Sequence, residues 1–159
     1  MRLRNLARVA AVGAAIALAA TGCSSGGDDG GDTNASGGDK ACDLIIGFVG
    51  PQTGDNAALG INISNGAQLA VDQYNEKNAD CKVTLKKYDS EGKPEKASTV
   101  VPEVVQDEKI IGVVGPAFSG ETKATGPTFE EAGLPIISAS ATNPLLSENG
   151  WKTFHRVLG

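Results

Sequence analysis

Short apolar runs alternate with amphipathic segments along residues 41–159. Three of these runs are apolar at most positions, and the first, over residues 44–49, is typical of a strand that a sheet buries on both faces. These three predicted strands cover residues 44–49, 110–114 and 134–137. Residues 82–88 alternate instead, with Val83 and Leu85 on one side, which favours a strand nearer the edge of the sheet. A fifth strand is predicted to begin within residues 154–158.

The segments between these strands repeat their apolar residues at the helical spacing of three and four. A first helix of about five turns is predicted from the positions of Leu59, Ile63, Ala67, Ala70, Val71 and Tyr74. Pro94 suits the first position of a second helix, and Pro102 is expected to kink that helix or to break it early. Ser119 is expected to begin a third helix as its N-cap, and Gly133 is expected to end it after about Ala132.

The alternation of strands and helices predicts the fold class. It indicates an α/β domain built on a doubly wound parallel sheet. Right-handed crossovers then place helices on both faces of that sheet. The composition agrees, because 40% of the 159 residues are apolar and 21% are charged, which is globular and excludes a wholly disordered chain.

Residues 1–22 have the pattern of an export signal. An apolar run over residues 9–20 follows three cations, Arg2, Arg4 and Arg8. As a helix this run spans about 18 Å, well short of a bilayer core of about 30 Å. Small residues then lead to Cys23, and this ending resembles a bacterial lipobox, whose cysteine is lipidated. An ordinary secretory signal with a cysteine nearby is the alternative.

Residues 24–40 are rich in Gly, Ser and Asp and contain no large apolar side chain. Such a segment cannot bury enough surface to offset its chain entropy, so it is predicted to be a flexible tether with a reach of roughly 20–25 Å. The expected organisation is a lipoprotein signal peptide at 1–22, a lipidated cysteine and tether at 23–40, and an α/β ligand-binding lobe at 41–159.

The charge balance excludes several classes of function. Fourteen cationic and nineteen acidic side chains give a net charge of −5, and Arg2, Arg4 and Arg8 leave the rest of the chain more acidic still. No nucleic-acid partner is expected, because phosphate binding needs a basic face. One His and three Cys cannot build a zinc site of the usual spacing, so no metal and no cofactor are expected.

Cys42 and Cys81 precede the first and second predicted strands. If these strands are parallel neighbours, their amino ends lie about 5 Å apart, which is within the Cα range of a disulfide. The sequence therefore predicts a bridge between Cys42 and Cys81. Two buried free thiols are the alternative.

The loops that follow three of the predicted strands are the candidate site. In open α/β sheets, ligands bind outside the carboxyl ends of strands, near the point where the strand order reverses. These loops cover residues 50–54, 115–122 and 138–144. They combine Gly or Pro with hydroxyl side chains and carry no strand-end carboxylate, His or Cys, which favours binding over bond breaking.

Two of these loops offer complementary groups to a zwitterion. As an N-cap, Ser119 would stand beside unpaired N–H groups and the positive end of a helix dipole, which suits a carboxylate. Ser140, Ala141 and Thr142 could offer a hydroxyl and carbonyl oxygens to an ammonium group. The alternatives are a serine that merely caps its own helix and a plain turn before Pro144.

The sequence resembles the branched-chain amino-acid binding proteins, the substrate receptors of bacterial ABC importers, from about Asp43 to Gly159. The resemblance is carried by IGFVGPQTGDNAALG, NGAQLAVDQYNEK, KKYDSEGKPEKA, IIGVVGPAFSGET and EEAGLPIISASATNP, followed by WKTFHRV. It implies one lobe of a type I periplasmic-binding fold, in which two α/β lobes close over an amino acid.

The resemblance also implies roles for single residues. Ser119 resembles the serine that binds the ligand carboxylate, with backbone help from its loop, which includes Gly120. Ser140, Ala141 and Thr142 resemble the segment that holds the ammonium by main-chain oxygen and hydroxyl. Phe118 and Leu59 fall where relatives contact the ligand, and Leu59 stands where the leucine-type receptors carry tyrosine.

The expected partners follow from the same resemblance. They are a small zwitterionic ligand, the permease subunits of an ABC importer, and the membrane through a lipid anchor. The expected location is the outer face of the bacterial cell membrane. Family members are more than twice as long, so the second lobe is expected to be absent from this chain, as in a fragment or a truncated reading frame.

Three other functions compete with this hypothesis. A hydrolase using Ser119 and His155 would need the Gly-x-Ser-x-Gly elbow, which is absent, and neither the phosphate-binding nor the dinucleotide-binding glycine motif occurs. A receptor of the same fold could instead bind an amide, urea or an aromatic acid. The chain could also be a lipid-anchored sensor or interaction protein without a role in transport.

Overall fold

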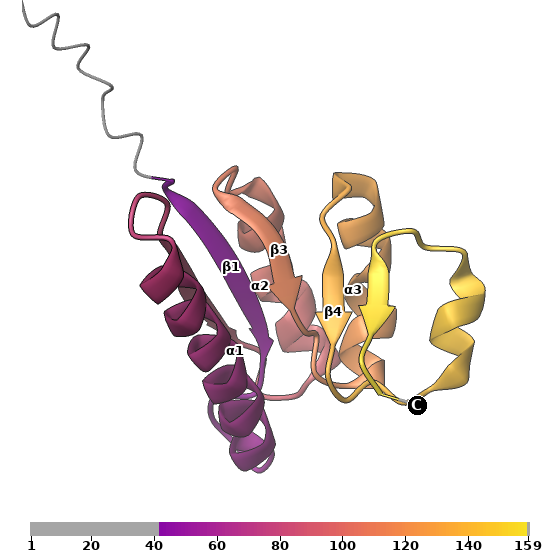
Figure 1. Ribbon diagram of the computed structural model, residues 1–159. Coiled ribbons are helices and arrows are strands. Elements are labelled where there is room, and N and C mark those ends of the chain that lie inside the picture. The colour runs from indigo at the N-terminus through magenta and orange to yellow at the C-terminus, as the bar shows by residue number, and fades with distance from the viewer. Residues whose placement is uncertain (1–41, 159) are drawn as a thin grey trace, which may run out of the picture. The chain divides into compact units, whose positions relative to one another are not determined.

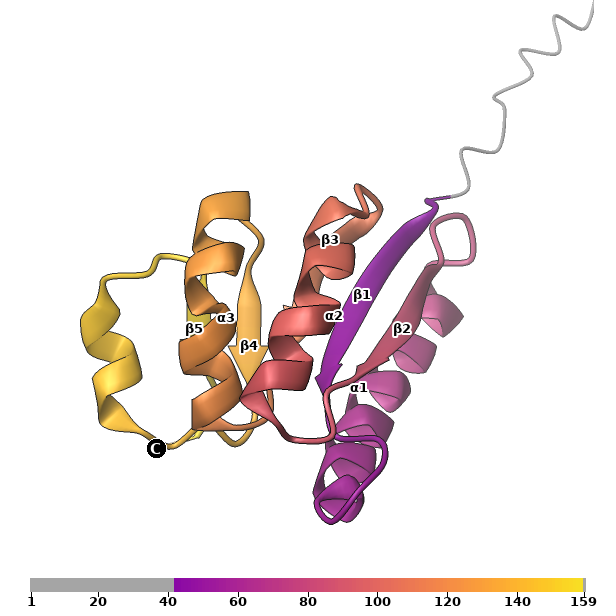
Figure 2. The same cartoon turned by 180° about the vertical axis from the view of Figure 1, so that it is seen from behind.

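The computed structural model describes residues 42–158, which form a five-stranded sheet with helices on both faces (Figures 1 and 2). The strands are β1 (Leu44–Gly50), β2 (Val83–Asp89), β3 (Ile110–Val114), β4 (Ile136–Ser138) and β5 (Phe154–Arg156). The helices are α1 (Ala57–Lys77), α2 (Pro94–Gln106), α3 (Ser119–Ala132) and the 3₁₀ helix η1 (Pro144–Asn149). The predicted signal at 1–22 and the predicted lipidation site Cys23 with its tether lie outside the described residues.

The five strands are parallel and stand in the order β2-β1-β3-β4-β5. From β1 the chain moves to β2 on one side, then crosses back past β1 to β3 and continues in the other direction. The strand order therefore reverses at β1, and the loops after β1 and β3 flank this reversal. The predicted doubly wound parallel sheet is confirmed, and the strand over residues 82–88 is an edge strand as expected.

The core lies between the sheet and the helices α2 and α3, which pack side by side on one face (Figure 2). Val101 and Val104 of α2 and Phe129 of α3 are almost fully buried. They pack in one cluster with Val49 of β1 and Ile136 of β4. The apolar stripe predicted for the second helix is thus the face that it turns to the core.

Of the two outcomes expected at Pro102, a kink or an early break, the early break does not occur, because α2 continues to Gln106. Pro102 lies on the exposed side of α2, whereas Val101 and Val104 hold the other side against the sheet. Proline removes one hydrogen bond to a carbonyl four residues earlier, and water can satisfy that carbonyl on a solvent-facing side. Packing therefore outweighs the local cost of the proline.

The predicted disulfide between Cys42 and Cys81 is present, and the two Cα atoms are 4.6 Å apart. The strands that follow begin in register, with Leu44 opposite Val83, so the two cysteines meet at one edge of the sheet. In the chain-entropy model, a crosslink between residues 39 positions apart contributes about 4 kcal/mol to the free energy of unfolding.

Helix α1 has 21 residues and lies on the sheet face opposite α2 and α3 (Figure 1). Its buried residues are Gly60, Ser64 and Val71. Within residues 42–158, no helix combines the length and the apolar character needed to cross a bilayer.

The ends of α3, β4 and β5 can be compared with the ends predicted from the sequence. Gly133 ends α3 in the left-handed conformation, with φ of 64°, as a C-cap glycine does. The strand β4 begins at Ile136, two residues later than predicted, because Pro135 has no N–H to give to a ladder. The fifth strand is shorter than its predicted range and ends at Arg156.

Candidate functional site

The loops after β3 and β4 are joined directly through Ser119. The backbone N–H of Asn143 donates a hydrogen bond of 3.1 Å to the Ser119 hydroxyl. Thr142, which precedes Asn143, therefore stands beside the amino end of α3. The two loops predicted to hold a zwitterion therefore lie together at one edge of the sheet.

Ser119 is not the N-cap of its helix, so that expectation is wrong. The N-cap residue is Phe118, and Ser119 is the first residue of α3. The Glu121 carboxylate, three residues beyond the cap, accepts a 2.7 Å hydrogen bond from the Phe118 N–H, as in a capping box. The Ser119 hydroxyl is thereby left to bind the neighbouring loop instead of its own helix.

Two serines hold the loop after β4 in place. The Ser140 hydroxyl donates to the carbonyl of Ala117 over 2.9 Å, and the Ser138 hydroxyl donates to the carbonyl of Pro116 over 2.7 Å. Ser138 Oγ also accepts from the N–H of Ala141 at 3.0 Å. The Ser140 hydroxyl is thus committed to the protein, and its main-chain oxygen remains the group that the resemblance assigned to a ligand.

Ala141 and Thr142 differ in exposure. Ala141 is fully buried, whereas Thr142 is exposed at the rim, which is the edge of the sheet where the loops at residues 50–54, 115–122 and 138–144 lie. The Arg156 guanidinium of β5 donates 3.0 and 3.4 Å hydrogen bonds to the carbonyl oxygens of Asn143 and Ala141. Sequence reasoning missed Arg156, because only the pairing of β5 with β4 brings it to this loop.

Asp89, at the end of β2, holds the loop after β1, and sequence reasoning missed it as well. Its carboxylate accepts hydrogen bonds from the N–H groups of Gln52 at 2.8 Å, Thr53 at 3.3 Å and Glu91 at 2.9 Å. Burial alone would raise the pKa of Asp89, but these donors and the Thr53 hydroxyl together lower it. The motif KKYDSEG contains Asp89, but the sequence did not indicate that Asp89 holds the loop after β1.

Phe118 lies where three loops meet. A Cβ placed on Gly92 would stand 2.9 Å from the Phe118 ring and 3.3 Å from the Asn56 side-chain nitrogen. The ring therefore packs over the backbone of the loop after β2, close to the start of α1. Gly120 is exposed next to Pro94, and Leu59 is 41% exposed in the first turn of α1.

The amino end of α3 carries a buried carboxylate. Glu121 has no exposed surface, and burial raises its pKa, which the Ser90 hydroxyl and the Phe118 N–H partly offset. The charge of Asp89 raises the same pKa further. The site thus combines neutral hydrogen-bonding groups at the rim with two carboxyl groups, Glu121 and Asp89.

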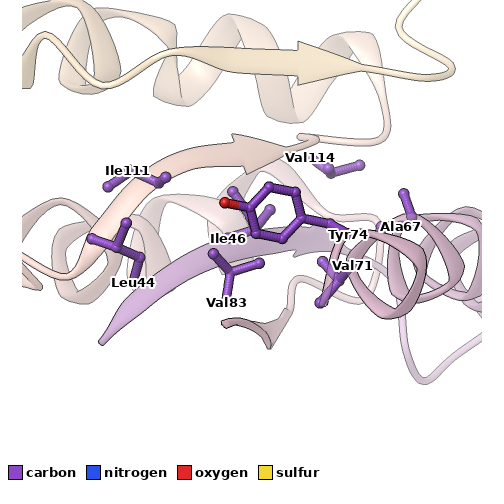
Figure 3. A pocket seen from close by; sticks show the side chains of 9 residues that line it. Leu44, Ile46, Ala67, Val71, Tyr74, Val83, Ile111 and Val114 are labelled. Carbon is purple, nitrogen blue, oxygen red and sulfur yellow. The ribbon is translucent and has the colours of Figure 1, made fainter. Parts of the chain in front are cut away.

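A cavity of about 340 Å³ lies elsewhere, between α1 and the sheet (Figure 3). Its lining is apolar and consists of Leu44, Ile46, Ala67, Ala70, Val71, Tyr74, Val83, Ile111 and Val114. Such a lining offers no partners for a carboxylate and an ammonium group, whose burial without partners is costly. The candidate site for a charged ligand is therefore the rim at the carboxyl ends of the strands.

Comparisons with known proteins show the family of this chain. Residues 44–158 match the family described as periplasmic binding protein, and the chain belongs to it. A Leu/Ile/Val-binding protein of Rhizobium johnstonii is 36% identical over 119 residues, 74% of this chain and 32% of that protein. A leucine-specific-binding protein of Salmonella typhimurium is 32% identical over 124 residues, 77% of this chain and 33% of that protein.

A solved structure agrees with these relatives. The branched-chain amino-acid transporter substrate-binding protein of Streptococcus pneumoniae, in complex with isoleucine, matches with a TM-score of 0.66 at 34% identity. The match covers 72% of this chain and 33% of that one. The chain thus spans about a third of the length of the relatives that it matches and forms one lobe of their fold. Membership of this family implies an exported protein.

Proposed function

We propose that this chain is the N-terminal lobe of an exported receptor that binds a branched-chain amino acid for an ABC importer. The single observation that carries the proposal is the hydrogen bond between Ser119 and Asn143, which joins the two loops expected to grip the ligand. The printed names of the relatives, which include Leu/Ile/Val-binding and leucine-specific-binding proteins, support the class of ligand.

The proposed mode of binding uses opposite ends of a zwitterion. The ligand carboxylate would accept hydrogen bonds from the first N–H groups of α3, at Ser119 and Gly120, and from the Ser119 hydroxyl. Helix N–H groups in the first turn have no partner within the helix, and the helix dipole favours an anion there. The ligand ammonium would lie against the Ser140 carbonyl oxygen and the Thr142 hydroxyl.

Binding without catalysis fits the groups at the rim. His155, the partner of Ser119 in the hydrolase alternative, is exposed on β5. Its neighbour Arg156 points toward the loop after β4, which it holds by hydrogen bonds. Because successive side chains of a strand point to opposite faces, the His155 side chain points away from that loop. The relatives named above are binding proteins as well.

A thermal-shift screen of the full-length protein that contains this chain tests the proposed ligand class. Leucine, isoleucine and valine at about 100 times Kd should raise the free energy of unfolding by about 2.7 kcal/mol. Ser119→Ala should weaken binding by about tenfold to a hundredfold, because it removes one hydrogen bond to a charged group. Ser98→Ala, on the exposed side of α2, is the matched control and should bind normally.

Two outcomes of the screen would contradict the proposal. Stabilisation by amides, urea or aromatic acids, with none from amino acids, would favour a receptor of the same fold for another ligand. A Ser119→Ala protein that binds isoleucine as tightly as the unaltered protein would remove the loops after β3 and β4 from the site.

Lipid anchoring through Cys23 and delivery to permease subunits complete the proposal. The charged, apolar and small-residue pattern of residues 1–22 supports the anchor, and membership of the family supports export. Cys23→Ala should release the protein from the membrane fraction into the medium. Retention of that variant in the membrane fraction would contradict the anchor.

A further inference from the structure

Glu121 is a buried carboxylate at the amino end of α3 that the proposed binding mode does not use. It is the third residue of the helix, and none of its surface is exposed. One oxygen, Oε2, accepts a 2.7 Å hydrogen bond from the Phe118 N–H. The other, Oε1, has no hydrogen-bond partner within residues 42–158, although the Ser90 hydroxyl is close enough to lower the pKa of Glu121.

The charges around Glu121 do not compensate it. The charged side chain that acts on it from another element is Asp89, which is held in its ionised form by four hydrogen bonds. The cations at the start of α2 are engaged elsewhere, because Lys93 and Lys96 bind Glu91 at 2.7 and 3.3 Å. An ionised Glu121 therefore lies next to a second negative charge.

A ligand carboxylate beside Ser119, two residues before Glu121 in α3, would add a third negative charge, which the ligand ammonium on the loop after β4 would offset only in part. The amino end of a helix carries about half a positive charge, which one carboxylate already uses. Carboxylates that share a site in this way do not all ionise, and one of them retains a proton. Burial raises the pKa of Glu121, so Glu121 is the carboxyl group expected to retain the proton.

We propose that Glu121 is a positioning residue that takes up one proton when a carboxylate ligand binds beside Ser119. The proposal rests on the proposed function. The proton comes from solvent and is bound at Oε1, the oxygen without a partner. Oε2 remains the acceptor of the Phe118 N–H, so the capping of α3 is preserved while the charge disappears.

The consequence is a ligand affinity that depends on pH. Above the pKa of Glu121 in the free protein, each bound isoleucine must bring a proton, and Kd rises by up to about tenfold per pH unit. Below that pKa the residue is already neutral, and the affinity levels off. A ligand without a carboxylate would not show this coupling.

Isothermal titration calorimetry on the full-length protein measures the protons taken up between pH 5 and 8. At each pH it uses two buffers that both hold that pH and differ in ionisation enthalpy, such as phosphate and Tris at the upper end of the range. At a pH where Glu121 is ionised in the free protein, isoleucine should bind to the unaltered protein with an uptake that approaches one proton, and the uptake should fall as the pH is lowered. Glu121→Gln keeps an oxygen for the Phe118 N–H and should bind isoleucine with no uptake and a flat pH profile. Glu131→Gln, an exposed residue of the same helix, is the matched control and should leave the uptake unchanged.

The titration of the unaltered protein decides the inference even if Glu121→Gln fails to fold. Isoleucine bound without proton uptake across this pH range would overturn the role of Glu121 and leave the proposed function intact. Full uptake in Glu121→Gln would do the same. Absence of isoleucine binding at every pH would overturn the proposed function, and the role of Glu121 with it.

Discussion

Gly60 is the residue at which α1 touches the loop after β1. A Cβ at this position would stand 1.7 Å from the carbonyl oxygen of Pro51, and Pro51 is itself buried. Backbone atoms in a packed loop cannot move aside cheaply. The absence of a side chain at Gly60 therefore lets α1 begin directly beside the rim.

Gly60→Ala should lower the free energy of unfolding by about 2 kcal/mol or more, although alanine favours a helix over glycine. Gly66→Ala is the control within the same helix, because nothing lies within 4 Å of a Cβ there. That substitution should stabilise the protein by about 0.5–1 kcal/mol. Urea unfolding of both variants measures the difference, and equal stability of the two would contradict the close contact at Gly60.

Sequence patterns predicted where Ser119 lies but not how it bonds. A serine before a helical pattern indicates an N-cap. In the structure the N-cap is instead Phe118, whose N–H donates to the Glu121 carboxylate, and the sequence pattern does not show this hydrogen bond. Asp89 and Arg156 were missed for a related reason. Apart from Glu91, the partners of Asp89 are 36 or 37 residues away along the chain, and those of Arg156 are 13 or 15 residues away. Only the folded sheet brings these groups together.

At the scale of elements, apolar periodicity predicted the order and type of the strands and the three α-helices. The runs that form β1 and β3 are short and are followed by Gly-Pro, which favours strands over helices. The failures came where packing competes with local preference. Pro102 does not end α2, because Val101 and Val104 hold that helix against the sheet.

The disulfide was predictable for a topological reason. Cys42 and Cys81 each stand at the start of a strand, and neighbouring parallel strands begin at the same edge. The prediction needed the pairing of β1 with β2, which the doubly wound pattern supplies. No comparable rule leads from sequence to the contact between Ser119 and Asn143, because loop conformations set that distance.

At the scale of the whole molecule, the two faces of the sheet differ. Helices α2 and α3 cover one face, whereas α1 covers β1 and β2 on the other (Figures 1 and 2). Ile111, Ile137 and Val157 are 47%, 44% and 76% exposed. Ile111 and Ile137 belong to β3 and β4, and Val157 follows β5. The apolar pattern of a strand predicts that its side chains are covered, but it does not say which segment covers them.

The rim lies in a chain that spans only part of the length of its relatives. In the relatives that it matches, this chain corresponds to about a third of the length. The lobe presents hydroxyls, carbonyl oxygens and helix N–H groups along one edge, where a small ligand would remain open to solvent on its other side. The account therefore places the charged ends of the ligand on this lobe and leaves the enclosure of its side chain to further structure.

The crystal structure of the full-length protein with isoleucine tests the central claim most directly. The account predicts the ligand carboxylate within about 2.7–3.2 Å of the Ser119 hydroxyl or of the first N–H groups of α3. It also predicts the ammonium against Thr142 and the Ser140 carbonyl oxygen. An isoleucine seated in the apolar cavity beneath α1, or anywhere away from these two loops, would contradict it.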